Sequence, residues 1–127
     1  DPTWLLGELL GNLQVGLLRW HRGERLAGSR LVQVHALDRL ISLVTGKAPP
    51  GAGSPDPFNA ERRLEQRFPE FAAKLPELAP GIDHTPRAAL AMLAALQAQG
   101  IEVPAGVEAG IRTLCSAPSP HATRSPT

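Results

Sequence analysis

The fold is decided by residues 2–45, PTWLLGELLGNLQVGLLRWHRGERLAGSRLVQVHALDRLISLVT. Asp1 precedes Pro2, and an aspartate cap followed by proline at the first helical position is a strong helix start. Apolar residues then recur up to an Arg-Gly-Glu joint at residues 22–24, and again from there to Gly46, a residue that favours the end of a helix. The stretch therefore predicts one long helix on each side of the joint.

The two predicted helices, residues 2–22 and 24–45, are apolar over most of their circumference. A helix that is apolar all round is usually buried. The short joint makes the two helices antiparallel neighbours, each roughly 30 Å long. Gly7 and Gly11 are four residues apart, a spacing that allows a second helix to come close. We therefore expect this pair to form the centre of an all-α antiparallel bundle.

The rest of the chain adds shorter helices, most of which begin at a proline or a capping residue. They are expected over residues 57–67, 70–75, 86–99 and 104–115, with a Gly- and Pro-rich loop over 47–55. Strand signals are absent from the sequence. The fold class that follows is all-α.

One helical domain is expected over residues 1–115, with the last two helices closing the bundle. The segment that carries Phe58, Phe68 and Phe71 should pack across one end of it. Residues 116–127 are rich in Pro and Ser and are predicted to be a disordered tail.

The composition limits the kinds of function. A net charge of +1 gives no broad attraction to nucleic acid or to a membrane, and no apolar run is long enough to span a bilayer. The single cysteine, Cys115, forms no internal disulfide and suits a reducing compartment, so we expect a cytoplasmic protein without a cysteine-based metal site. The chain begins with Asp1 and its only methionine is Met92, which leads us to expect a fragment or a processed piece.

Glu8, Asn12 and Arg19 form the first candidate site, which we call the polar stripe. At about 100° per residue these side chains fall on one narrow strip of the first helix. Burying a charge costs free energy unless the charge is paired. The polar stripe is therefore either a satisfied structural network, a solvated strip, or the wall of a binding cleft that faces another domain. In the last case these three residues bind substrate.

His35, Asp38, Arg39 and Ser42 share a face of the second predicted helix. Asp38 lies about one turn from His35 and could orient its imidazole. No nucleophile at a matching spacing completes a catalytic triad, and two potential ligands make a poor metal site. We therefore predict a polar helix face here, with no catalytic residue and no metal ligand.

The stretch Arg30-Leu-Val-Gln-Val-His35 resembles the active-site motif of the helical ribonucleases called HEPN domains. The resemblance implies RNA cleavage without metal, in which the histidine handles protons and the arginine the phosphate charge. Leu31 stands where that family usually carries a polar residue. A regular helix also turns Arg30 and His35 well apart.

Charged residues dominate the predicted helix over residues 57–67. Glu61, Arg62, Arg63 and Glu65 form either an exposed charged surface or an ion-pair clamp against the first helix or another domain. Arginine suits the second role because its guanidinium binds a carboxylate or a phosphate with two hydrogen bonds.

A wider resemblance covers residues 4–115. The segments WLLGELLGN (4–12), GLLR (16–19) and RGE (22–24), followed by a long apolar helix, are similar to the helical C-terminal half of bacterial nucleotidyltransferases. The pattern is nearest to the small enzymes that act on aminoglycosides or lincosamides and to their uncharacterised relatives. The later stretch with Asp-Pro-Phe and Glu-Arg-Arg resembles those uncharacterised members.

In that family a preceding mixed-sheet domain carries a Gly-Ser motif and an Asp-x-Asp pair that bind Mg²⁺ and a nucleotide. This chain lacks that arrangement, because its Gly28-Ser29 pair lies inside a predicted helix and has no aspartates with it. The resemblance implies a lid or acceptor-binding wall with Glu8, Asn12 and Arg19 on the cleft side. It implies an upstream nucleotidyltransferase domain and a small-molecule acceptor as partners, and no cofactor or catalytic residue in this chain.

Two other functions stay open. One is a non-enzymatic helical interaction module, for which we expect an exposed apolar patch and consider a homodimer. The other is the HEPN-type ribonuclease. Membrane and nucleic-acid partners are not expected from the charge.

Overall fold

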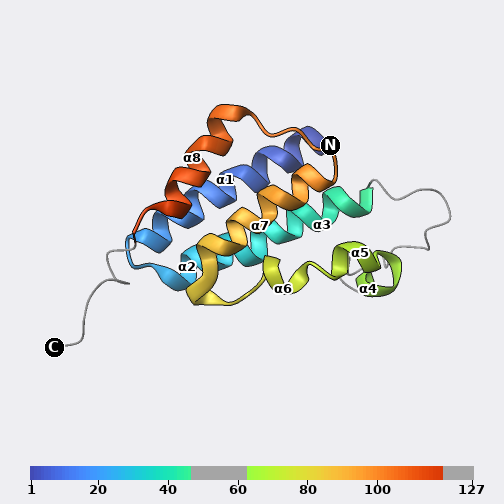
Figure 1. Cartoon of the computed structure of the whole chain (residues 1–127), viewed down its shortest axis with the longest axis horizontal. Coiled ribbons are helices and arrows are strands. Elements are labelled where there is room, and N and C mark those ends of the chain that lie inside the picture. Colours follow the sequence, from blue (N-terminus) through green and yellow to red (C-terminus); the bar gives the residue numbers. More distant parts are fainter. Residues whose placement is uncertain (47–62, 119–127) are drawn as a thin grey trace.

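The computed structural model describes residues 1–46 and 63–118, and each regular element in those two ranges is a helix (Figure 1). The elements in chain order are α1 Pro2–His21, α2 Arg25–Arg30, η1 Leu31–Ala36, α3 Leu37–Gly46, α4 Leu64–Arg67, α5 Pro69–Ala72, α6 Leu75–Leu78, η2 Ile82–His84, α7 Thr85–Ala98 and α8 Ala105–Ser116. The expected all-α class is confirmed. The predicted loop over 47–55 and residues 119–127 of the predicted tail lie outside the described residues, and Ser116 still belongs to α8.

The turn after α1 is a Schellman motif, and it forms the predicted joint. Gly23 adopts a φ of 91°, its N–H donates to the Trp20 carbonyl at 3.1 Å, and the Glu24 N–H donates to the Arg19 carbonyl at 2.9 Å. Glycine is the residue that takes this positive φ without strain. The motif ends α1 and turns the chain back along it, as the sequence predicts.

The second long helix is continuous but not uniform. Elements α2, η1 and α3 follow one another from Arg25 to Gly46, and the middle part, Leu31–Ala36, is a π-helix. Backbone bonds in a π-helix run between residues five apart, and such turns are frequent at functional sites. The sequence predicts the helix but gives no sign of this wider turn, which changes the side chains that share a face.

The two long helices cross at Gly16 and Gly28. A Cβ added to Gly28 would lie 2.6 Å from the Gly16 carbonyl oxygen, and one added to Gly16 would lie 2.8 Å from Cγ2 of Val32. Only glycine fits at this distance. Gly7 and Gly11, the pair expected to allow close approach, have nothing within 4 Å of an added Cβ. The close approach predicted for α1 therefore exists at a different pair of glycines.

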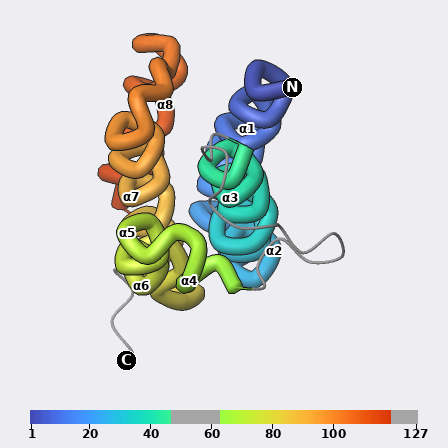
Figure 2. The backbone as a smooth tube through the Cα atoms, turned by 90° about the vertical axis from the view of Figure 1, so that its right-hand side faces the viewer, coloured from blue at the N-terminus to red at the C-terminus, as the bar shows by residue number. Residues whose placement is uncertain are grey.

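Figure 2 shows two layers, with α1, α2 and α3 in one and α7 and α8, together with the short helices α4 to α6, in the other. The core lies between them, and its fully buried large side chains come from both layers. They include Leu9, Leu13, Leu17, Val32, Leu40, Leu78, Met92, Leu93, Leu96 and Ile111. The two last helices thus close the bundle, as expected.

The short helices correct two predictions. The helix expected over residues 57–67 is described only from Arg63 onward, where it forms the single turn α4, so Phe58 lies outside the described residues. The helix expected over 70–75 is wrong, because the chain forms two turns there, α5 and α6. Pro76 lies in the first turn of α6, where a missing N–H costs nothing. Phe71 is buried and Phe68 packs on the core.

Candidate functional site

The polar stripe of Glu8, Asn12 and Arg19 lies at the surface of α1. Glu8 is exposed, and Asn12 and Arg19 are partly exposed. Within the described ranges no hydrogen bond or ion pair joins the three to one another, and Arg19 Nη1 instead contacts Glu24 Oε1 at 3.3 Å. The structural-network interpretation is therefore wrong. A solvated strip and a cleft wall are the two interpretations that the geometry leaves.

An apolar surface borders the polar stripe. This outer face of α1 consists of Trp4, Gly7, Gly11, Val15 and Leu18. The tryptophan, valine and leucine are 54%, 44% and 50% exposed. On a regular helix these three side chains fall within roughly 60° of one another, opposite the core. The expectation that α1 is buried all round is wrong for this face.

A cation–π contact joins α3 to the same surface. The guanidinium carbon of Arg39 lies 5.1 Å from the centre of the Trp4 ring, within the range of attraction between a guanidinium and an indole face. The sequence predicts that Arg39 shares a face with His35, Asp38 and Ser42. Asp38 instead lines a groove beside α4 and α6, whereas Arg39 reaches toward α1. The structure thus directs Asp38 and Arg39 to different surroundings and places the Arg39 guanidinium beside Trp4.

The π-helical turn changes the relation between Arg30 and His35. Residues five apart lie about 140° apart around an α-helix, and the wider turn of a π-helix reduces this angle. Both side chains are exposed. The turn over Leu31–Ala36 therefore brings Arg30 and His35 closer to one face than a regular helix would. The HEPN resemblance predicts metal-free RNA cleavage that Arg30→Ala and His35→Ala each abolish.

The Arg-Gly-Glu joint also has a structural explanation. Glu24 contacts two arginines, with Oε1 at 3.3 Å from Arg19 Nη1 and Oε2 at 3.3 Å from Arg22 Nε. All three side chains are more than a third exposed, so these ion pairs contribute little to stability. Gly23 provides the positive φ that the Schellman turn needs, and Glu24 forms ion pairs with Arg19 and Arg22. The motif that carries the family resemblance is therefore also what this turn requires.

A buried polar cluster that the sequence does not predict centres on Gln33. Its Nε2 donates to the Gly81 carbonyl at 2.7 Å, with Thr85 Oγ1 at 3.1 Å and Ser29 Oγ at 3.2 Å, and its Oε1 accepts from the Gly81 N–H at 2.9 Å. His84 occupies the cap position of α7, and Thr85 is the first residue of the helix. The Thr85 hydroxyl is committed to this cluster. The Gln33 cluster fastens the chain before α7 to the π-helical turn.

A second set of contacts supports the same connection. The Trp20 indole N–H donates to the Ile82 carbonyl at 3.1 Å, and the guanidinium of Arg25 lies 4.5 Å from the Trp20 ring centre. Arg25 also contacts Asp83 at 3.3 Å. These residues hold the joint end of α1 against η2. Their role is structural, since these contacts join residues of the fold to one another.

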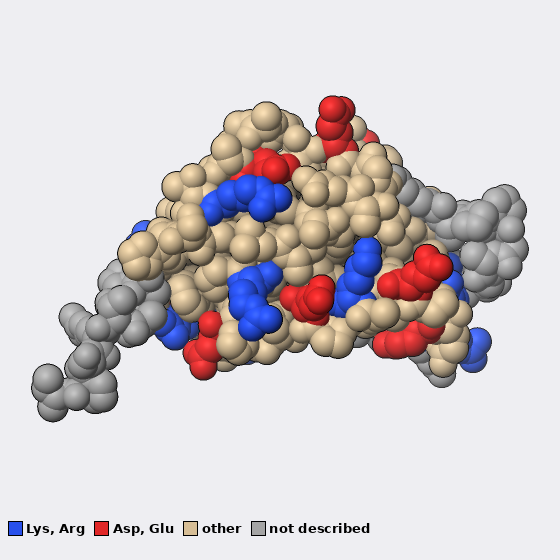
Figure 3. All heavy atoms as spheres, in the orientation of Figure 1, with Lys and Arg blue, Asp and Glu red and all other residues tan. Residues whose placement is uncertain are grey.

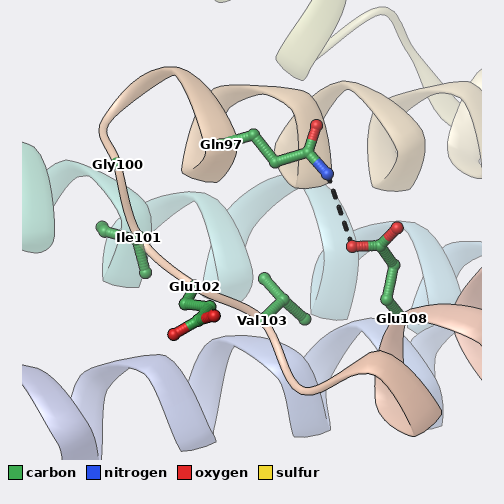
Figure 4. Close-up of a pocket in the computed structure, with 6 residues that line it drawn as sticks. All are labelled: Gln97, Gly100, Ile101, Glu102, Val103 and Glu108. Carbon is green, nitrogen blue, oxygen red and sulfur yellow. Dashed lines mark hydrogen bonds between the residues drawn. The ribbon is translucent and has the colours of Figure 1, made fainter.

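Grooves in the described residues lie away from the polar stripe. One of about 380 Å³ lies at the connection from α7 to α8 and is lined by Gln97, residues 100–103 and Glu108 (Figure 4). Gln97 Nε2 contacts Glu108 Oε1 at 3.4 Å across it. A second, of about 280 Å³, lies between the π-helical turn and α4. Neither of these two grooves is lined by Glu8, Asn12 or Arg19.

The surface chemistry excludes some other sites in the described part of the chain. Figure 3 shows acidic and basic side chains interspersed on one face, without a large area of one sign. No group of three or more potential ligands could hold a metal ion there, and no helix there is long and apolar enough to cross a membrane. Burial raises the pKa of the Cys115 thiol to about 11, so this cysteine is a poor nucleophile at neutral pH.

Comparison with known proteins gives no match: no protein-family model, no curated protein and no solved structure is significantly similar to this chain.

Proposed function

We propose that this chain is the helical substrate-binding domain of a nucleotidyltransferase-like protein. In this proposal a separate domain with Gly-Ser and Asp-x-Asp motifs binds Mg²⁺ and the nucleotide, and the polar stripe forms one wall of the acceptor site. The observation that supports it is the position of Glu8, Asn12 and Arg19 at the surface, outside the core and outside the internal grooves.

The chemistry of the polar stripe suits a small polar acceptor. The Glu8 carboxylate accepts hydrogen bonds from amines or hydroxyls, the Asn12 amide both donates and accepts, and the Arg19 guanidinium donates to anionic groups. Arg39, held over the Trp4 ring, adds a second guanidinium to the neighbourhood. The half-buried single thiol of Cys115 agrees with a cytoplasmic location for such an enzyme.

The gene that encodes the chain provides the first test. An in-frame Gly-Ser followed by Asp-x-Asp upstream of the Asp1 codon is the expected result, and a stop codon or an unrelated domain there contradicts the proposal. The full-length protein should then transfer a nucleotide to an acceptor. Glu8→Gln and Asn12→Ala should each lower kcat/KM for the acceptor roughly tenfold or more, because each removes a hydrogen bond.

The KM for the nucleotide should not change in either variant, since the catalytic domain binds it. Glu70→Gln is the control, because Glu70 is an exposed carboxylate on α5, in the other layer. Equal effects of Glu8→Gln and Glu70→Gln would show that the polar stripe is a solvated strip.

An interaction module without chemistry is the second candidate, and the outer face of α1 favours it. Exposed Trp4, Val15 and Leu18 form an apolar strip along one helix, whereas the other exposed large apolar side chains, Leu26, Val34, Ile82 and Leu90, come from several elements. Such a strip is characteristic of a surface that binds another protein. This candidate predicts a binding partner for the outer face whether or not a catalytic domain exists.

A further inference from the structure

Apart from the guanidinium of Arg39 beside the Trp4 ring, the outer face of α1 is open to solvent. Trp4, Val15 and Leu18 are about half exposed, and an added Cβ at Gly7 or Gly11 has nothing within 4 Å. Successive members of the set Trp4, Gly7, Gly11, Val15 and Leu18 are three or four residues apart. This is the spacing with which one helix packs along another.

The shape of the outer face is complementary to itself. Its centre is low, because Gly7 and Gly11 carry no side chain, and Trp4 rises at one end and Leu18 at the other. If a second copy lies antiparallel with a two-fold axis at Gly11, Trp4 of each copy lies opposite Leu18 of the other, and Gly7 opposite Val15. Val15 of each copy then fills the space that Gly7 of the other leaves open, and each contact occurs twice, as an isologous interface requires.

The charges on α1 favour the antiparallel arrangement. Asp1 and Glu8 are the acidic side chains of its first half, and Arg19 and Arg22 are the arginines at its other end. An antiparallel pair places the acidic half of each helix along the basic half of the other, and it also opposes the two helix dipoles. Glu24 contacts both arginines and offsets part of their charge. A parallel pair would place like charges side by side.

From these observations we propose that the outer face of α1 binds a second copy of this chain in an antiparallel, two-fold dimer. A helix of this length presents a strip about 30 Å long and about 10 Å wide. That is roughly 300 Å² on each copy, less than the roughly 800 Å² per partner of a standard stable interface. The dimer is therefore weak and reversible, and it dissociates at low protein concentration.

The dimer goes beyond the proposed function and does not depend on it. The polar stripe lies between the outer face and the Gly16 crossing, so it stays at the edge of the pair. A failure of nucleotide transfer would leave the dimer untouched, because the dimer is measured on this chain alone.

Sedimentation equilibrium of the whole chain, from roughly 1 μM to 500 μM, tests the proposal. The wild-type chain should pass from monomer to dimer across that series. Gly11→Leu should weaken the dimer at least tenfold, because the new side chain separates the two helices at their crossing. It should not unfold the monomer, since the position is open in the single chain. Ala94→Leu is the matched control, because Ala94 is an exposed position on α7 in the other layer.

Tryptophan fluorescence gives a second readout. Trp4 is 54% exposed and Trp20 is 5% exposed, so a blue shift with concentration that Trp4→Leu removes assigns the change to the outer face. Leu18→Asp should also keep the chain monomeric. A wild-type chain that stays monomeric throughout the series overturns the proposal. An equal loss of dimer in Gly11→Leu and Ala94→Leu overturns it too, because the interface would then lie elsewhere.

Discussion

The two sides of α1 have similar residues and opposite surroundings. On the inner side Leu13 is completely buried, and Gly16 lies so close to the second helix that a Cβ would meet atoms at 2.8–3.0 Å. On the outer side Leu18 is 50% exposed and Gly11 faces open space. The comparison teaches that residue type alone does not determine whether an apolar residue or a glycine of α1 lies in the core or at the surface. The point at which the two long helices cross, at Gly16 and Gly28, decides which of these residues are buried.

The largest expected effect compares two leucines. Leu13→Ala should lower the free energy of unfolding by about 2–5 kcal/mol, because it leaves a cavity in a closed core. Leu18→Ala should lower it by less than about 1 kcal/mol, since that side chain is already half in water. Urea denaturation of both variants at low protein concentration measures the difference. Equal losses of unfolding free energy would mean that Leu13 and Leu18 are equally buried, which contradicts the orientation of α1 in the structure.

The inner side of α1 is also where the sequence predicts the structure best. The Asp-Pro start, the glycine joint and the antiparallel pair follow from local rules about caps and periodicity, and the structure contains all three. Which glycines make the close approach does not follow from those rules. Gly7 and Gly11 have the expected spacing, but Gly16 and Gly28 are in contact, because the joint geometry sets the depth and rotation of the crossing.

Gly28→Ala should have the next largest effect, a loss of about 2–3 kcal/mol. The added methyl would lie 2.6 Å from the Gly16 carbonyl oxygen and 2.8 Å from the Trp20 backbone nitrogen. These atoms belong to the backbone of α1, so the whole helix must move, as in other overpacked cores. Thermal unfolding followed by circular dichroism checks it. An unchanged melting temperature would show that α1 and α2 are farther apart than described.

The same contrast holds for polar residues. Gln33 is buried and bonded to Gly81 and Thr85, whereas Asn12 of the polar stripe is partly exposed. Gln33→Ala should cost about 2 kcal/mol, because it leaves buried polar groups without partners. Asn12→Ala should cost less than about 0.5 kcal/mol. Denaturant unfolding measures the free energy of unfolding of both variants. A larger loss in Asn12→Ala would mean that the polar stripe forms a structural network.

The candidate site could be predicted only in part. The sequence places Glu8, Asn12 and Arg19 on one strip, and a regular α1 keeps them there. The Gln33 cluster depends on the π-helical turn, which no local pattern in residues 31–36 predicts. Tertiary contacts with the segment before α7 accompany that turn, and they are distant in sequence.

The smallest expected effect has the opposite sign. Gly11→Ala should raise the free energy of unfolding by about 0.5–1 kcal/mol, because alanine loses less backbone entropy in a helix and its methyl has no atom within 4 Å. Thermal unfolding at low micromolar concentration measures the single chain without its dimer. Gly7→Ala should behave alike, since its position is equally open. A loss of stability at Gly11 would mean that something already packs on the outer face of the single chain. Gly28→Ala and Gly11→Ala would then both destabilise the chain, and they would not distinguish the two sides of α1. The open surface from which the dimer is inferred would not exist.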